Sequence, residues 1–281
     1  MVMLTKPRII SLLLVTTIAP MFVAGNPTWL LVLVVLVGGY LMAGGANAVN
    51  MYLDRDIDTQ MSRTRLRPIP SGRMGAKAVL AFGVALATAA TFLLARFTNV
   101  LTALLALGGF YFYVFVYTRW LKRTTPQNIV IGGAAGAFPP LVGWAAMTGA
   151  IDLTAIYLFL IIFYWTPPHF WALALLKQRD YGRAGIPMAP LVWGERVTMR
   201  QMLWYNLILI ALTLMPFTFG AFGLIYLFSA IVLGAILLMG VVRVVRSAEW
   251  TGPAWLVYKF SLLYLALLFL AMVIDRKVLG A

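Results

Sequence analysis

The chain has 281 residues, of which 63% are apolar and only 11% charged, and its mean hydropathy is +0.93. Because soluble domains carry about 25% charged residues, a soluble globular fold is excluded. Lys and Arg number 22 against eight Asp and Glu, a net charge of +14, which in so apolar a chain indicates loops at an anionic membrane surface rather than nucleic-acid binding. The lack of cysteine excludes disulfides, thiol catalysis and Cys-ligated metals.

Nine apolar runs are long enough to cross a bilayer, which takes about 20 residues of helix. In chain order they are 9–24, 29–48, 78–95, 100–117, 128–147, 153–172, 201–219, 222–242 and 254–274. The first run resembles a signal peptide, but the second begins at Trp29 with no small-residue cleavage site between them, so we interpret it as a helix. We therefore expect one all-α polytopic membrane domain over residues 1–281 with nine transmembrane helices.

The distribution of cations predicts the orientation of these helices. With a cytoplasmic N-terminus, 19 of the 22 Lys and Arg lie on the cytoplasmic side, and only Arg96, Arg276 and Lys277 lie on the other. Such asymmetry follows the positive-inside rule. The two long loops, 50–77 and 173–200, are thus predicted to be cytoplasmic and the C-terminus to lie on the opposite side. Topology alone explains most of these cations.

The two long loops follow the second and sixth helices. This spacing favours two copies of a four-helix unit with a ninth helix added, although no residue-by-residue repeat accompanies it. Pro139-Pro140 and Pro167-Pro168 remove backbone donors inside the fifth and sixth helices, which is tolerated where the freed carbonyls face protein or a cavity. We expect these two helices to line the interior of the bundle.

The densest group of acids follows the second helix. If the helix continues, Asn50, Asp54 and Asp58 recur every four residues and share one face, while Asp56 points elsewhere. Carboxylates aligned in this way repel each other, and a hard divalent cation would neutralise them. Mg²⁺ fits, because it takes oxygen ligands and is completed by a phosphate-bearing substrate. The pattern predicts Asn50, Asp54 and Asp58 as catalytic metal ligands.

Arginines follow the acids within a few residues. Arg63, Arg65 and Arg67 supply guanidinium donors suited to phosphate, and Arg63 and Arg67 are candidate substrate contacts. The alternative is that the acids only balance these arginines in a solvated loop. Mg²⁺ ligands beside arginines favour a diphosphate site.

The second long loop repeats the pattern in weaker form. Asp180 lies among Lys177, Arg179 and Arg183, just beyond the end of the sixth helix. We consider Asp180 a candidate catalytic residue and the three cations candidate diphosphate contacts. An ordinary positive-inside loop explains them equally well.

Several runs resemble the intramembrane aromatic prenyltransferases of the UbiA superfamily. The acidic motif with Arg67-Pro68 is similar to the superfamily's first aspartate-rich motif. The following runs, which lie within residues 5–190, resemble its haem-farnesylating branch: Thr5-Lys6-Pro7-Arg8, Leu121-Lys122-Arg123-Thr124, Gln127-Asn128 through Gly133, Ala137-Phe138-Pro139-Pro140, Gly143-Trp144, Trp165 through Trp171, Asp180-Tyr181 and Pro187-Met188. One position departs from the superfamily pattern. The second motif of the superfamily has paired acids, whereas in this chain the residue four positions after Asp180 is Ala184.

The resemblance implies a UbiA-type bundle that binds Mg²⁺ as cofactor and uses farnesyl diphosphate to alkylate the 2-vinyl group of haem B, giving haem O. It also implies a place in a bacterial inner membrane and a haem A synthase or terminal oxidase as recipient of the product. His169 is the sole histidine and hence the only imidazole available to ligate haem iron. Lys122 and Arg123 are candidates for the haem propionates, and Tyr117 for a ring facing the developing carbocation.

Two other functions remain open from the sequence. A prenyltransferase with a quinone precursor or a chlorophyll-like ring as acceptor would use the same diphosphate site. A secondary transporter would also combine duplicated halves with broken helices. Its coupling carboxylates should lie near the midplane, however, whereas every acid here lies at or beyond the end of a predicted span, Asp152 and Asp275 on the outer side.

Overall fold

Helices form all the regular structure in residues 2–62 and 64–278, the part of the chain that the computed structural model describes. Eight helical runs are long and apolar enough to cross a membrane: α3 (Trp29–Leu53), α5 (Ala76–Phe97), Val100–Thr124, Asn128–Thr148, α10 (Leu153–Leu176), α13 (Glu195–Thr218), α14 (Leu224–Arg246) and α15 (Thr251–Val278). A ninth, α2 (Pro7–Ala24), has a shorter apolar part, Ile10–Ala24. These nine match the nine predicted runs in order.

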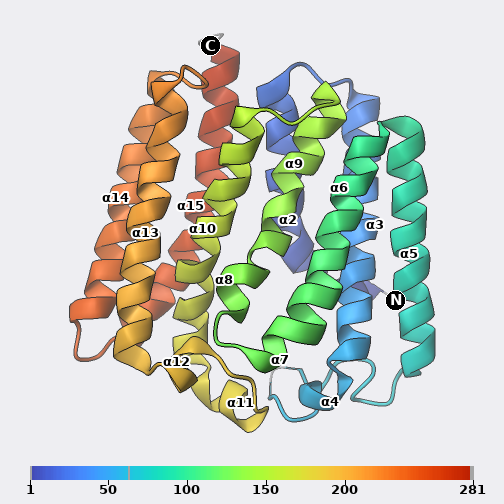
Figure 1. Cartoon of the computed structure of the whole chain (residues 1–281), viewed down its shortest axis with the longest axis vertical. Coiled ribbons are helices and arrows are strands. Elements are labelled where there is room, and N and C mark those ends of the chain that lie inside the picture. Colours follow the sequence, from blue (N-terminus) through green and yellow to red (C-terminus); the bar gives the residue numbers. More distant parts are fainter. Residues whose placement is uncertain (1, 63, 279–281) are drawn as a thin grey trace.

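Short helices connect the long ones. They are α1 (Val2–Thr5), α4 (Arg55–Asp58), α11 (Gln178–Arg183) and α12 (Ala189–Val192). In Figure 1 the long helices alternate in direction, and α4, α11 and α12 lie at the end of the bundle opposite the C-terminus. The two long loops therefore meet at the same end, as the charge pattern predicts.

The fifth and sixth helices are the most buried, as their proline pairs predict. Buried residues make up 61% of the apolar stretch in Asn128–Thr148 and 72% in α10, against 22–44% in the other spans. The first of these runs is divided into α8 (Asn128–Gly132) and α9 (Ala134–Thr148). Polar backbone inside the bundle is thus surrounded by protein rather than lipid.

Glycines allow the closest helix contacts in the bundle. A side-chain carbon on Gly143 of α9 would fall onto the backbone carbonyl of Thr17 in α2, and one on Gly45 of α3 would meet the carbonyl of Gly83 in α5. Helices in a bilayer associate through such close backbone approach, because lipid provides little hydrophobic drive for association. These contacts fix α2 and α5 beside the more central helices.

The fourth span is not a uniform α-helix. It begins as α6 (Val100–Tyr111), continues as a π-helical segment η1 (Phe112–Leu121) and ends in α7 (Lys122–Thr124). In η1, the Oγ1 of Thr118 donates to the carbonyl of Tyr113, five residues earlier, at 2.8 Å. Segments of π-helix frequently occur at functional sites, and this one leads directly into Lys122.

Candidate active site

Asn50, Asp54 and Asp58 form one buried polar face, as the sequence predicts. Although α3 ends at Leu53 and α4 begins at Arg55, the helical hydrogen bonds continue from the Asp54 amide to the Asn50 carbonyl (2.9 Å) and from the Asp58 amide to the Asp54 carbonyl (2.8 Å). All three residues are at most 4% exposed. The side chain of Asp56 is 57% exposed, so it points away from this face.

A cation from another segment pairs with each buried carboxylate. The Nζ of Lys122 lies 2.5 Å from Asp54 Oδ2, and Nη1 of Arg67 donates to both oxygens of Asp58 at 2.9 and 2.8 Å. The amide of Asn50 donates to Asp54 Oδ2 at 2.8 Å and to Thr118 Oγ1 of η1 at 3.1 Å. A buried carboxylate needs such partners, since an unpaired buried charge costs several kcal/mol.

Lys6 and Asn47 also belong to this face, although the sequence did not predict them as site residues. The Nζ of Lys6 donates to the amide oxygens of Asn47 at 3.1 Å and of Asn50 at 3.2 Å, and the Asn47 amide donates to the Thr5 carbonyl. Lys6 has a left-handed backbone (φ 54°), which turns the chain between α1 and α2. Burial, followed by repulsion from Arg67, lowers the pKa of Lys6 to about 7. The sequence signals are the lysine before Pro7 and the asparagine three residues before Asn50.

The face is compatible with a magnesium ion that is shared with a substrate. Asp54 Oδ1 is buried and has no hydrogen-bond partner, so one carboxylate oxygen is available to a cation. No cluster of three or more Asp, Glu, His or Cys side chains suited to a metal occurs in the described residues. Mg²⁺ is commonly held by one or two carboxylates plus substrate phosphates rather than by a complete protein cage, and Asp54, Asp58 and Asn50 fit that mode.

The second long loop reaches the first through Asp180. The Oγ of Ser62 donates to both carboxylate oxygens of Asp180, at 3.0 and 2.8 Å. The side chains of Lys177, Arg179 and Arg183 are exposed and have no hydrogen bond or ion pair with other described residues. Asp180 is thus tied to the first loop, whereas the three cations predicted beside it are not brought to the buried face.

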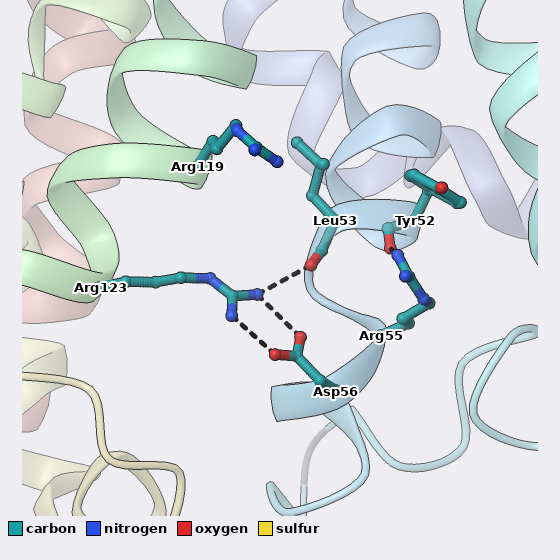
Figure 2. A pocket seen from close by; sticks show the side chains of 6 residues that line it. All are labelled: Tyr52, Leu53, Arg55, Asp56, Arg119 and Arg123. Carbon is teal, nitrogen blue, oxygen red and sulfur yellow. Dashed lines mark hydrogen bonds and ion pairs between the residues drawn. The ribbon is translucent and has the colours of Figure 1, made fainter.

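Arg123 lies at the outer edge of the face. Its guanidinium forms a bidentate pair with Asp56 at 2.6 and 2.8 Å and donates to the Leu53 carbonyl (Figure 2). It also lies 3.8 Å from Asp54 Oδ1. The hydrogen bond from Arg123 lowers the pKa of Asp56 to about 2. A propionate would therefore have to compete with Asp56 for this arginine. Arg63, another predicted contact, lies outside the described residues.

Tyr117 packs inside the bundle on the segment that carries Thr118. Its ring stacks on Tyr113 with 5.7 Å between centroids, and it lies so close to Gly132 of α8 that a side chain at Gly132 would overlap it. The glycine at 132 therefore makes room for the aromatic ring predicted to face the substrate.

His169 lies apart from the carboxylates, on the interface between α10 and α15. Its ring stacks between Trp165 (4.5 Å) and Tyr258 (4.9 Å), and its Nδ1 is 2.7 Å from Ser261 Oγ. The Ser261 hydroxyl is also 2.9 Å from the Tyr258 carbonyl, and when it donates to that carbonyl it accepts from Nδ1–H. In that tautomer Nε2 carries the lone pair, which is the form that binds metals.

Comparisons with solved structures find the same fold over nearly the whole chain. The structure aligns with a digeranylgeranylglyceryl phosphate synthase at a TM-score of 0.80 and 18% identity, covering 97% of this chain and 96% of that one. It aligns with a UbiA homolog from Archaeoglobus fulgidus bound to DMAPP and Mg²⁺ at a TM-score of 0.70 and 16% identity, covering 95% and 98%. These likenesses establish the fold.

Sequence comparisons identify the family. The UbiA prenyltransferase family model matches residues 12–267, and the chain belongs to that family. It is 56% identical to a protoheme IX farnesyltransferase of Roseiflexus castenholzii over 99% of this chain and 52% of that protein. A relative with the same name from Symbiobacterium thermophilum is 52% identical, over 98% of this chain and 93% of that protein. The chain spans about half the length of the first curated relatives that it matches.

Proposed function

We propose that this protein transfers the farnesyl group of farnesyl diphosphate to the 2-vinyl group of haem B. The terminal vinyl carbon forms a bond to C1 of the farnesyl group, and diphosphate leaves with the electron pair of the broken C–O bond. Water then adds to the resulting cation and loses a proton to solvent, which gives haem O. The observation that carries the proposal is the buried Asp54–Asp58 face surrounded by Lys6, Lys122 and Arg67. The choice of haem B as the acceptor rests on relatives that are named protoheme IX farnesyltransferase.

The residues around the face suit a departing diphosphate. Negative charge develops on the leaving oxygens, and positioned ammonium and guanidinium groups stabilise it most effectively when water is excluded. Lys6, Lys122 and Arg67 are held there by Asn50, Asp54 and Asp58, within hydrogen-bond distance. Mg²⁺, when bound by Asn50, Asp54 and Asp58, would neutralise further charge on the diphosphate. Asp180, tied to Ser62, would close the site from the second loop.

The porphyrin and the farnesyl chain would bind in the apolar interior of the bundle. A farnesyl chain and a porphyrin both require surroundings that exclude water, and α10 is the most buried span. Tyr117 would present its ring to the developing cation. His169 would ligate the haem iron through Nε2, with Ser261 holding the tautomer as outer partners of metal-bound histidines do. Arg123, at the outer edge of the face, would reach a propionate in competition with Asp56.

The placement of the outer acids is an argument against a transporter. Asp152 caps α10 by accepting from the Ala155 amide at 3.0 Å, and the buried Asp275 accepts from the Gly223 and Tyr226 amides at the start of α14. Carboxylates at helix N-termini are stabilised by the helix dipole and by the free amides. Both acids therefore have structural partners, whereas coupling sites lie near the midplane.

The test is the mass of haem extracted from cells that lack haem O and express this chain. We expect haem O in cells with the wild-type protein and none above background with Asp54→Asn. Glu249→Gln is the matched control, because Glu249 is an exposed acid in the loop between α14 and α15. If the cells contain a prenylated quinone precursor and no haem O, the acceptor is a quinone precursor rather than haem B. If Asp54→Asn still forms haem O, the carboxylate face has no part in the mechanism.

A further inference from the structure

A polar cavity lies between the junction of α3 with α4 and the end of η1. It has a volume of about 450 Å³ and is lined by Tyr52, Leu53, Arg55, Asp56, Arg119 and Arg123 (Figure 2). The volume is within the range of about 300–1,000 Å³ typical of small-molecule sites. The lining includes three guanidiniums and one carboxylate, so the cavity carries an excess of positive charge. The reaction proposed above gives no role to Arg55 or Arg119.

The three arginines differ in how much of their hydrogen-bonding capacity is used. Arg123 is engaged by Asp56 and the Leu53 carbonyl. Arg55 is held over the Tyr52 ring at 4.5 Å while its Nη1 donates to the Tyr52 carbonyl. Arg119 has no hydrogen bond or ion pair with any residue that the structure describes. Arg119 and the remaining donors of Arg55 are therefore available to a ligand in the cavity, and a guanidinium fork suits phosphate oxygens.

The location of the cavity indicates where such a phosphate would come from. Arg119 precedes Trp120, which is 60% exposed, and one turn earlier Phe115 is 46% exposed. Exposed aromatic rings near the end of a span are typical of the membrane–water interface, so this face of η1 borders lipid. Basic pockets between helices at that level bind the headgroups of anionic lipids.

We infer that this cavity binds the phosphate headgroup of an anionic phospholipid, with Arg55 and Arg119 as its principal contacts. The lipid would lie between the end of α3 and η1, beside Arg123, which lies 3.8 Å from Asp54. A structural lipid there would hold together the two segments that carry Asp54 and Lys122. The inference does not depend on the identity of the prenyl acceptor.

The purified full chain can be titrated in detergent with phosphatidylglycerol, phosphatidylcholine or inorganic diphosphate, and the bound species counted by native mass spectrometry. Removing an arginine near a headgroup should lower affinity about fivefold. We expect the double variant Arg55→Gln/Arg119→Gln to bind phosphatidylglycerol at least about tenfold more weakly than wild type. Phosphatidylcholine binding should be unchanged. Arg196→Gln/Arg200→Gln, which removes two exposed arginines of α13, is the matched control.

Arg119→Gln alone keeps the test valid if the double variant is unstable, because that side chain makes no hydrogen bond or ion pair with the described residues. About a fivefold loss of affinity is expected. Equal phosphatidylglycerol affinity in the Arg55/Arg119 and Arg196/Arg200 variants would overturn the inference. Arginine-dependent binding of diphosphate without phosphatidylglycerol would also overturn it, since the site would then belong to a soluble anion.

Discussion

Asp54, Asp56 and Asp58, where α3 meets α4, differ in burial although each is only two residues from the next. Asp54 and Asp58 are 1% exposed and each pairs with a cation, whereas Asp56 is open to solvent and pairs with Arg123. Exposed pairs of this kind contribute about 0–1 kcal/mol to stability. The same chemical change should therefore have different effects at these positions.

We predict that Asp58→Asn lowers turnover by about two to three orders of magnitude, the loss seen when one group that stabilises developing charge is removed. Asp56→Asn, the matched control, should reduce turnover less than about threefold. Product formation in membranes with equal amounts of inserted protein is the measurement. Equal losses at the two positions would contradict separate roles for the buried and exposed acids.

The predicted role of His169 can be separated from its packing. His169→Ala removes a ring that lies between Trp165 and Tyr258 and should lower thermal stability. If Nε2 binds haem iron, this variant should also lose an imidazole-type haem spectrum and bind haem B more weakly. Ser261→Ala disturbs the same contact but keeps the imidazole, so it should retain the spectrum. A haem spectrum unchanged in His169→Ala would leave the residue with packing alone.

Sequence periodicity predicted the acidic face because four-residue spacing survives the short break between α3 and α4. It did not predict Lys6, which reaches Asn50 only because the chain turns back at a left-handed residue. Nor did it predict the contact between Ser62 and Asp180, which depends on how two loops fold. Lys177, Arg179 and Arg183 were predicted at the site because their charge suits phosphate, but charge alone does not fix where an exposed side chain points.

At the scale of the helices, hydropathy predicted the nine runs and the proline pairs predicted the two central ones. Hydropathy does not distinguish an α-helix from a π-helix, so η1 was not anticipated, although it brings Thr118 to Asn50. Close helix crossings are also invisible to hydropathy. The crossing of α2 and α9 at Gly143 is the tightest that the structure describes, because no Cβ fits against the Thr17 carbonyl.

We predict that Gly143→Ala destabilises the protein by about 1–3 kcal/mol, the usual cost of overpacking, measured as loss of folded protein on heating in detergent. Gly136→Ala is the matched control on the same helix, because nothing lies within 4 Å of its added carbon. Replacing glycine by alanine in a helix is otherwise favourable by about 1 kcal/mol. Equal stability of the two variants would show that α2 shifts to make room for the added methyl group at Gly143.

At the scale of the whole molecule, both long loops and the acidic face lie at one end of the bundle. The same end carries most of the cations, which the positive-inside rule assigns to the cytoplasm. The orientation matters for the proposed function, because a charged farnesyl diphosphate would not cross the bilayer to reach a site on the opposite side.

Two single cysteines test this orientation, since the native chain has none. Ser71, in the first long loop, and Ala150, between α9 and α10, are both exposed. The connection from α4 to α5 and the connection from α9 to α10 lie at opposite ends of the bundle (Figure 1). With a membrane-impermeant thiol reagent on intact cells, we expect Ala150→Cys to be labelled and Ser71→Cys to be protected. Both should react after the membranes are permeabilised, which controls for reactivity. Labelling of Ser71→Cys alone in intact cells would reverse the topology and place the diphosphate site on the outer face, away from cytoplasmic isoprenoids.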